Sequence, residues 1–343
     1  MTSDKTLGGA AIGLGVGGSH LAAYGQAPGM KAVAACDVNE TLLARAKEEF
    51  GLAQVYSDYR RLLDDPEVHV VSICTPDHLH AEHALAALEA GKHVLVEKPM
   101  CVSVEEAEAL VKKVRATGLK LGVGNVLRFW PQFVAARKLV ADGRVGELFH
   151  VEGDYIHECR QVYARTPWRS DPRHPQCIVL GGAVHPLDLM RWVAGEVEEV
   201  FAYSNHKALP WFGLPDNYVS VLRFKSGVTG KCQVSTGVQL RPHQKLGLLA
   251  YGAQGSVWTD INEPQVYLYV ADEVPHQNRY ATIPVEPQAG KPIQGEIAQL
   301  AAAIRGEGEP MPDVVDGART VAVCCAIIES AGTGQAVKVR TEF

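Results

Sequence analysis

The segment from residue 68 to residue 99 constrains the fold more than any other part of the sequence. It begins with an apolar, β-branched run, Val68–Cys74, which predicts a strand buried on both faces of a parallel sheet. A helix ending at Gly91 follows, and a second short strand, His93–Val96, comes directly after it. This order of strand, helix and strand predicts a βαβ unit of a parallel α/β sheet.

Each of these strands is followed by a short loop: Thr75, Pro76 and Asp77 after the first, and Glu97, Lys98 and Pro99 after the second. Ligands of open α/β sheets bind outside the carboxyl ends of the strands, so we expect both loops at one crevice. Asp77 is expected to cap the helix that follows it.

A glycine-rich turn lies between an expected strand at residues 10–12 and a helix. Its glycines at 13, 15 and 18 fit GxGxxG, and Val16 and Gly17 complete the turn. In this motif Gly13 permits the tight turn, Gly15 lets the backbone approach a pyrophosphate, and Gly18 lets the helix pack on the strand. The turn therefore predicts dinucleotide binding.

Asp37 ends the next expected strand, residues 31–36. A carboxylate at this position accepts hydrogen bonds from the ribose hydroxyls of adenosine and repels a 2′-phosphate, so NAD is favoured over NADP. The alternative is that Asp37 only caps the helix expected at residues 39–50.

Four motifs of the chain resemble those of the Gfo/Idh/MocA oxidoreductases, the family of glucose-fructose oxidoreductase and inositol dehydrogenase. They are TPDHLH at 75–80, GKHVLVEKP at 91–99, NVLRFWP at 125–131 and GGAVHPLDLMRW at 181–192. The resemblance covers nearly the whole chain. It implies an N-terminal Rossmann domain at residues 1–125 and a C-terminal domain at 126–343 for substrate binding and oligomerisation.

The strand pattern from Val200 to Tyr269 supports the second half of this division. Short apolar runs separated by turn signals predict a large, mostly antiparallel open sheet, so the fold class is α/β followed by α+β. Helices are expected at 297–304 and 314–331 and a strand at 335–341, and the helix at 314–331 is expected to pack back on the first domain.

The resemblance implies catalytic roles for Lys98 and His185. Lys98 would stabilise the developing alkoxide charge, and His185 would move the hydroxyl proton while hydride passes to or from the nicotinamide. The sequence departs from the family at Gly181, where many relatives carry Asp. If Pro186 opens a helix, Asp188 lies on the same face as His185 and would orient it. The alternative is that His185 only caps that helix or packs in the core.

Further candidates come from the same motifs and from the region between them. The expected cofactor contacts are Gly13, Gly15, Val16, Gly17, Gly18, Asp37, Thr75, Pro76, Asp77, His80, Glu97, Lys98 and Asn125. The expected substrate contacts are Lys98, Arg128, Tyr155, His157, Trp168, Arg169 and His185. Aromatic side chains suit the C–H face of a sugar ring, and Arg, His and Tyr suit its hydroxyls. Arg128 has an alternative role in a salt bridge at the domain junction, and the others have one as exposed polar residues.

Composition excludes several classes of partner. The chain has 343 residues, with 33 basic and 39 acidic side chains and a net charge of −6, and no basic cluster, so neither nucleic acid nor an anionic membrane is expected. Its eight cysteines lack CxxC spacing, which favours a reducing cytoplasm. The apolar, glycine-rich segment 7–23 has the alternative of a signal peptide, but its glycines have dinucleotide-loop spacing. No recognised zinc spacing occurs, although Asp171, His174, Cys177, His185 and a histidine group at 78, 80 and 83 offer ligand types.

The chain is therefore predicted to be an NAD-dependent dehydrogenase of a sugar, cyclitol or derivative. The resemblance also implies a homodimer or homotetramer formed through the C-terminal sheet. One alternative is an NAD-retaining, redox-assisted glycosidase or lyase of the same family, which the glycine at 181 favours. A second is a non-catalytic dinucleotide-binding regulator, because one scaffold hosts many functions.

Overall fold

The computed structural model describes residues 6–171, 173–174, 176–239, 244–270, 281–288 and 290–343. The chain divides into two compact units. The first comprises Met1–Val126, Lys291–Ala318 and Phe343, and the second comprises Leu127–Gly290 and Arg319–Glu342. Residues 291–318 thus group with the first unit, whereas the division of the sequence at residue 125 assigns them to the second domain.

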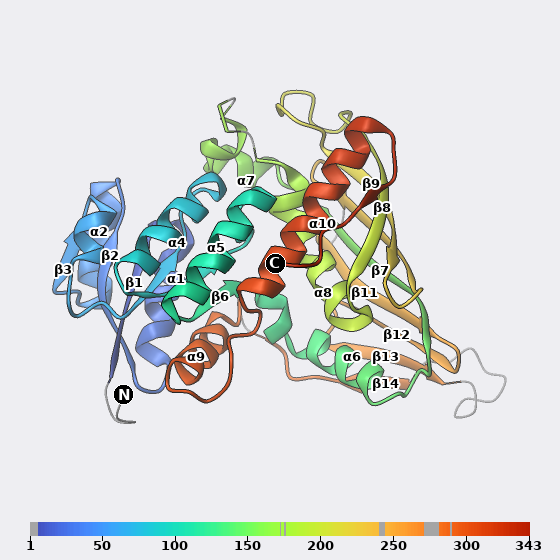
Figure 1. Cartoon of the computed structure of the whole chain (residues 1–343), viewed down its shortest axis with the longest axis horizontal. Coiled ribbons are helices and arrows are strands. Elements are labelled where there is room, and N and C mark those ends of the chain that lie inside the picture. Colours follow the sequence, from blue (N-terminus) through green and yellow to red (C-terminus); the bar gives the residue numbers. More distant parts are fainter. Residues whose placement is uncertain (1–5, 172, 175, 240–243, 271–280, 289) are drawn as a thin grey trace. The chain divides into compact units, whose positions relative to one another are not determined.

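The first unit is built on a parallel sheet of six strands in the order β3-β2-β1-β4-β5-β6. Figure 1 labels β1, β2, β3 and β6 of this sheet. The strands are β1 (Leu7–Ile12), β2 (Met30–Cys36), β3 (Gln54–Tyr56), β4 (Val70–Ile73), β5 (His93–Glu97) and β6 (Leu121–Gly124). This is the order of a Rossmann sheet, which confirms the predicted fold of this half. The chain winds outward from β1 in both directions, so the switch point lies between β1 and β4, where such sheets bind ligands.

Helices cover this sheet in two groups. The helices are α1 (Leu14–Gln26), α2 (Glu40–Phe50), α3 (Tyr59–Leu63), η1 (Asp77–Leu79), α4 (His80–Glu89), α5 (Val104–Thr117) and α9 (Ile293–Ile304). In one group α1 packs against α2 and α9, and in the other α4 packs against α3 and α5. Every residue of β1 and β4 is buried, as expected for strands between two helical layers.

The structure rules out the alternative role of Asp37 as a helix cap for residues 39–50, and the cap predicted at Asp77 is wrong. Asn39 caps α2, because its side chain accepts hydrogen bonds from the N–H groups of Thr41 and Leu42, so Asp37 is not the cap of that helix. Asp77 lies inside the short helix η1, and Leu79 occupies the cap position of α4. The carboxylate of Asp37 instead accepts hydrogen bonds from the N–H groups of Leu14 and Asn39.

The second unit is built on a sheet of nine strands in the order β14-β13-β12-β11-β7-β10-β9-β8-β15. The strands are β7 (Leu148–His157), β8 (Val197–Asn205), β9 (Asn217–Phe224), β10 (Thr229–Ser235), β11 (Gln244–Gly252), β12 (Gly255–Asp260), β13 (Gln265–Val270), β14 (Ala281–Pro284) and β15 (Val337–Lys338). The pair β7–β10 is parallel and the other neighbours are antiparallel, which confirms the predicted sheet. The strand expected at residues 335–341 is reduced to Val337–Lys338.

Helices pack on this sheet as well. They are α6 (Pro131–Ala141), α7 (Arg160–Arg165), α8 (Val184–Ala194) and α10 (Val314–Thr333), with short helices η2 (Val126–Phe129), η3 (Pro167–Ser170) and η4 (Val179–Ala183). The helix α8 packs on β7, β10 and β11, and α6 packs on β12 and β13. The helix α10 begins in the first unit and ends in the second.

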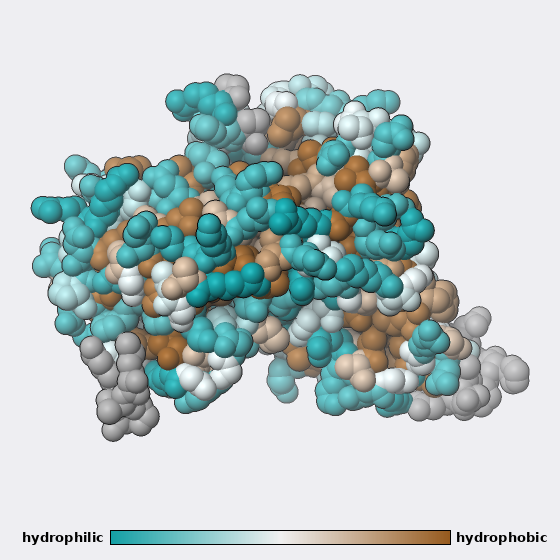
Figure 2. All heavy atoms as spheres, viewed as in Figure 1, coloured by the Kyte–Doolittle hydropathy of each residue, from teal (hydrophilic) through white to brown (hydrophobic). Residues whose placement is uncertain are grey.

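The surface is mainly polar on the face shown in Figure 2, where apolar side chains are scattered among hydrophilic ones. Some large apolar side chains of the second unit are nonetheless exposed, among them Tyr203, Val219 and Val221 on the adjacent strands β8 and β9. Within the described residues, no helix is both long and apolar enough to cross a membrane.

Candidate active site

The glycine-rich turn connects β1 to α1 and uses its glycines for different purposes. Gly13 has φ +88°, and a Cβ there would lie 2.6 Å from the carbonyl oxygen of Cys74, so only glycine fits. A Cβ at Gly15 or Gly18 would meet nothing within 4 Å. A Cβ at Gly17 would lie 3.2 Å from the Cβ of Ala11 on β1. Close packing of helix on strand therefore depends on Gly17, and its assignment to Gly18 is wrong.

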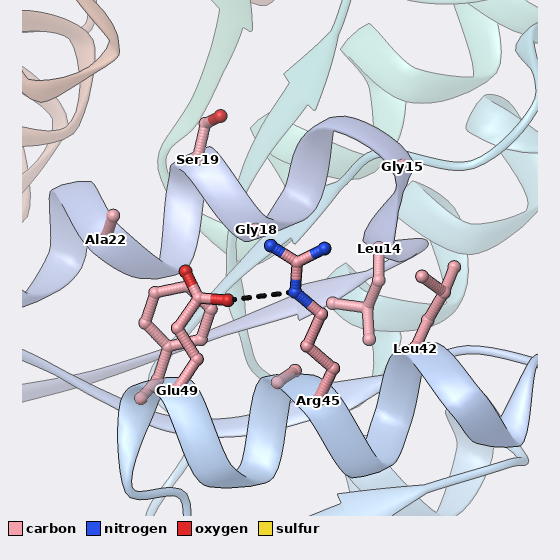
Figure 3. A pocket seen from close by; sticks show the side chains of 10 residues that line it. Leu14, Gly15, Gly18, Ser19, Ala22, Leu42, Arg45 and Glu49 are labelled. Carbon is pink, nitrogen blue, oxygen red and sulfur yellow. Dashed lines mark hydrogen bonds and ion pairs between the residues drawn. The ribbon is translucent and has the colours of Figure 1, made fainter.

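A pocket of about 320 Å³ lies between α1 and α2, beside this turn. Figure 3 shows Gly15 and Gly18 on α1 opposite Arg45 and Glu49 on α2. Arg45 Nε donates a hydrogen bond to Glu49 Oε2 at 3.2 Å, so these two charged residues of α2 pair with each other. The open space over Gly15 leaves backbone N–H groups at the start of α1 accessible, as binding of a phosphate requires.

Asp37 follows β2 and is half-buried next to the turn. Its Oδ2 accepts a hydrogen bond from the N–H of Leu14 at 2.6 Å, and its Oδ1 accepts one from the N–H of Asn39 at 2.8 Å. These bonds fix the carboxylate at the end of the strand, where it can still accept hydrogen bonds from hydroxyls. Val38 beside it is 91% exposed, an apolar surface suited to a flat base that the sequence reasoning did not select.

His80 joins the loops that follow β4 and β5. Its Nε2 lies 2.8 Å from the carbonyl oxygen of Thr75, and its Nδ1 lies 2.7 Å from that of Pro99. The two ring nitrogens therefore face carbonyl oxygens of different loops. Thr75 also hydrogen-bonds His83 through its hydroxyl, at 3.1 Å. The loops are therefore adjacent, as predicted from the βαβ unit, and His80 holds them together.

The other predicted residues of these loops differ in exposure. Lys98, Thr75 and Pro76 are half-buried, as is Val16 in the glycine-rich turn, whereas Asp77 and Glu97 are buried. The half-buried Lys98 follows Glu97 at the carboxyl end of β5. A lysine in this position combines a mobile cation with partial removal from water, which suits stabilisation of a developing negative charge.

A buried polar network that sequence reasoning missed lies behind Glu97. His20 on α1 contacts Glu97 Oε1 through Nε2 at 3.3 Å and Ser72 Oγ through Nδ1 at 3.0 Å, and Tyr24 hydrogen-bonds the same Ser72 hydroxyl. Burial acts to raise the pKa of Glu97, but the hydrogen bond and charge of His20, together with the charges of Lys291 and Lys98, outweigh it and hold this pKa below its usual value. Glu97 also accepts a hydrogen bond from the N–H of Lys98. The signal was present, since His20 has helical spacing with buried Gly17 and Tyr24.

Asn125 follows β6 at the same edge of the sheet. Its side chain is 2% exposed, and within the described part of the chain neither its Oδ1 nor its Nδ2 has a hydrogen-bond partner. A buried amide without partners is costly unless a ligand completes it. Three features together fit a bound dinucleotide. The turn at Gly15 is open, and the amide of Asn125 and the carboxylate of Asp37 can still form hydrogen bonds with the amide and hydroxyl groups of the cofactor.

In the second unit, the predicted substrate residues form two groups, one of which includes His185. The ring of Tyr155 stacks on that of His185 with centroids 6.0 Å apart, and its hydroxyl hydrogen-bonds His157 Nδ1 at 3.0 Å. The guanidinium of Arg169 lies over the ring of Trp168, 4.3 Å from its centroid. The strand β7 carries Tyr155 and His157, and α8 carries His185, so the packing of this helix on this strand forms the group.

His185 is the second residue of α8, and the π-helical turn η4 directly precedes it. The helix therefore begins before Pro186 instead of at it, and His185 is not a capping residue. Single π-helical turns occur often at functional sites, because they change the direction in which neighbouring side chains point.

Arg128 and Asp188 contact each other within the second unit. Arg128 Nε donates to Asp188 Oδ2 and Nη2 donates to Oδ1, each at 2.8 Å, and the exposed fractions of the side chains are 3% and 2%. Thr320 also donates a hydrogen bond to Asp188 Oδ1, at 3.3 Å. The structure thus gives Arg128 the salt bridge that was its alternative role, and gives Asp188 a partner other than the expected His185.

The zinc alternative gains no support. Among the residues that the structure describes, no group of three or more His, Cys, Asp or Glu side chains is arranged to hold a metal ion.

Comparison with known proteins agrees with this geometry. Residues 8–125 match the model of the oxidoreductase family with an NAD-binding Rossmann fold, and residues 133–258 match the Gfo/Idh/MocA C-terminal domain. The chain belongs to the Gfo/Idh/MocA family of oxidoreductases. Its first unit is an NAD-binding domain, as Asp37 predicts, and the resemblance of its motifs to this family is confirmed.

Individual relatives in this family act on polyols. Levoglucosan dehydrogenase of Pseudarthrobacter phenanthrenivorans is 27% identical over 345 residues, which cover 86% of each chain. Myo-inositol 2-dehydrogenase of Thermotoga maritima is 29% identical over 246 residues, covering 69% of this chain and 70% of the relative. The solved structure of levoglucosan dehydrogenase in complex with NADH has a TM-score of 0.86 and 26% identity, and covers 98% of this chain and 100% of that one.

Proposed function

We propose that this member of the Gfo/Idh/MocA family transfers hydride between NAD and a hydroxyl-bearing carbon of a sugar, cyclitol or derivative. The observation that carries the proposal is the group around His185, where an imidazole is stacked on Tyr155 and adjoined by His157. It offers a titratable ring, hydroxyl and imidazole donors and acceptors, and aromatic surface, which together suit a polyol. The relatives named above support the same substrate class.

Each residue of the proposed site would have a separate role in binding or catalysis. NAD, when bound, supplies the hydride acceptor or donor at its nicotinamide ring. Asn125 would bind it through the buried amide, and Glu97, held as a carboxylate by His20, would bind it from the end of β5. Lys98 would hold the reacting oxygen and stabilise its negative charge, and His185 would take or return the hydroxyl proton.

The test is an absorbance measurement at 340 nm with NAD and a panel of sugars and cyclitols. We expect an increase with at least one of them, and a loss of about 100-fold or more in kcat/KM in Lys98→Ala and His185→Asn. The exposed Lys112 on α5 provides a control, and Lys112→Ala should retain full activity. Equal activity of wild type and both site variants would overturn the proposal.

The same purified protein distinguishes a dehydrogenase from the alternative, an NAD-retaining, redox-assisted glycosidase or lyase. That reaction oxidises and then reduces its substrate in each cycle, so NAD would copurify with the protein and product would form without net change at 340 nm. Mass analysis of the purified protein under native conditions, with and without added sugar, measures both. Binding of NAD without turnover of any substrate would instead favour a regulator.

We propose further that the chain assembles into homodimers or homotetramers through the open face of the nine-stranded sheet. The exposed side chains Tyr203, Val219 and Val221 support this, because exposed apolar groups on neighbouring strands favour burial against a partner. Light scattering of Val221→Asp should show a smaller assembly than that of the wild type. The eight free cysteines support a reducing compartment, the cytoplasm.

A further inference from the structure

The glycines that precede His185 are each packed against a side chain from another segment. A Cβ at Gly181 would lie 2.8 Å from Cδ of Gln176, and a Cβ at Gly182 would lie 2.7 Å from the ring of Tyr155. Gln176 is 6% exposed. Its carboxamide therefore occupies the space that any side chain at position 181 would need, one helical turn before His185.

Gln176 also fixes the position of Arg169. Arg169 Nη1 donates a hydrogen bond to Gln176 Oε1 at 2.5 Å, and the N–H of Gln176 donates one to the carbonyl oxygen of Arg169 at 3.0 Å. The guanidinium also lies over the ring of Trp168, 4.3 Å from its centroid. The guanidinium is thus oriented by contacts that are all electrically neutral.

The charge of Arg169 is not balanced as those of its neighbours are. Arg160 pairs with Glu158, and Arg173 pairs with Asp171 at 2.7 Å. Across the ranges that the structure describes, Arg169 makes no ion pair, and its buried Nε has no hydrogen-bond partner. A partly desolvated guanidinium with unused donors is the side chain that proteins use to bind planar carboxylates through two hydrogen bonds.

This charge acts on two tyrosines, of which Tyr155 stacks on His185. Burial raises the pKa of Tyr155, and the positive charge of Arg169 lowers it by a smaller amount. The same opposition holds for Tyr163, whose pKa burial raises. Arg169 hydrogen-bonds Gln176, and Gln176 lies against Gly181, one helical turn before His185. A group bound by Arg169 would therefore lie in the region of the proposed proton-transfer residue.

We propose that Arg169, oriented by Gln176, binds a carboxylate of the substrate, so that the enzyme prefers a sugar acid or a carboxylated cyclitol to the neutral polyol. This rests on the proposed function, because it concerns the substrate of the same site. Arg169 is here a binding residue, and Gln176 is a positioning residue that acts through it.

The test compares matched substrates with NAD at 340 nm: neutral hexoses and cyclitols, the corresponding uronates and aldonates, and the hexose 6-phosphates. We expect kcat/KM for one acid to exceed that of its neutral counterpart by about 10- to 100-fold, as for hydrogen bonds to a charged group. Arg169→Met should lower kcat/KM for the acid at least tenfold more than for the neutral compound. Arg173→Met, which removes a nearby exposed arginine already paired with Asp171, is the matched control and should change neither.

Gln176 is tested by two variants that keep its size. Gln176→Leu removes the oxygen that accepts from Arg169, and we expect it to raise KM for the acid with little change in kcat. Gln176→Glu places a carboxylate against the guanidinium, and it should abolish the preference for acids while neutral substrates are still oxidised. Thermal melting of each variant confirms that it is folded.

The outcomes separate this inference from the proposed function. Turnover of neutral polyols alone, with equal effects of Arg169→Met on every substrate, overturns the carboxylate site and leaves the dehydrogenase standing. A preference for a phosphate ester that is lost in Arg169→Met also overturns the assignment to carboxylates. If no substrate is turned over, the proposed function fails, and calorimetric binding of the acids to wild type and Arg169→Met still tests the site, since equal binding overturns it.

Discussion

Arg128 and Asp188 form a buried salt bridge with two parallel hydrogen bonds, each 2.8 Å long. The guanidinium also lies 5.5 Å from the ring centroid of Trp192. Arg128 is the second residue of the second unit, shortly after the last strand of the Rossmann domain, and Asp188 lies on the helix that carries His185. The pair therefore joins the start of the second unit to the helix of the proposed site.

Removing one member of this pair should destabilise the protein strongly. Asp188→Leu leaves a buried guanidinium without its counter-charge, and we expect a loss of about 3–5 kcal/mol in the free energy of unfolding. The measurement is urea denaturation followed by tryptophan fluorescence. The control is the double variant Arg128→Met/Asp188→Leu, which removes both charges and should recover most of the loss. A double variant as unstable as the single one would contradict this account.

Because of the buried contact between His20 and Glu97, we expect the stability of the protein to decrease at acid pH. The pKa of Glu97 is depressed in the folded state, so its contribution is present above the ordinary pKa of glutamate, ~4.3, and is lost as the pH falls toward the folded value. His20→Leu leaves the carboxylate buried without this partner and should cost about 1–3 kcal/mol at pH 7. The difference in melting temperature between wild type and variant should shrink from pH 7 to pH 3.

Ser72 provides the control for this experiment. Ser72→Ala removes the other hydrogen bond of His20 but leaves the pair with Glu97 intact. Its melting temperature should differ from that of the wild type by a similar amount at each pH. A pH dependence as large as that of His20→Leu would assign the effect to the serine instead.

Local sequence signals predicted the fold closely, because the residues that set each element are neighbours in the chain. The helix α5, for example, is capped by Ser103, whose hydroxyl accepts from the N–H of Glu106, and ends at Gly118 in the left-handed conformation. Hydrophobic runs likewise identified the Rossmann strands. A family motif selected His185, and the polar and aromatic residues between the motifs selected Tyr155 and His157. The structure brings these three residues together.

The contacts that the sequence did not predict join residues far apart in the chain. The pairing of Arg128 with Asp188 and that of His20 with Glu97 depend on packing between elements, which hydrophobic periodicity does not encode. Gly181 illustrates the limit most clearly. Its lack of a side chain suggests a missing group, yet the space is filled by Gln176, whose position depends on the path of an irregular loop.

Glu296 on α9 should make the stability of the protein depend on pH a second time, with a sign opposite to that of Glu97. Its side chain is 4% exposed, and neither carboxyl oxygen has a hydrogen-bond partner within the described chain. Burial raises its pKa well above the ordinary value, and the negative charge of Glu97 raises it further. The stability linked to this group is therefore complete below the pKa of an unfolded glutamate, ~4.3, and is lost as the pH rises toward the folded value.

Replacing the acid by an amide of the same shape should remove this dependence. We expect Glu296→Gln to melt at a higher temperature than the wild type at pH 8 and at nearly the same temperature at pH 4.5. Glu307→Gln, which changes an exposed glutamate just beyond the same helix, should leave the profile unchanged. Parallel profiles for the wild type and Glu296→Gln would show that this carboxyl is ionised in the folded protein.

Two substitutions in the glycine-rich turn between β1 and α1 should have different effects, one on stability and the other on cofactor binding. Gly13→Ala forces a side chain into a left-handed conformation and against the backbone of Cys74, so it should cost at least about 1–2 kcal/mol in the free energy of unfolding. A Cβ at Gly15 meets no protein atom within 4 Å but occupies the space kept open beside the start of α1. Gly15→Ala should therefore fold normally and bind NAD at least tenfold more weakly by calorimetry, because its methyl group blocks the approach of the phosphates. Unchanged NAD affinity in a folded Gly15→Ala would move the phosphate site away from this turn.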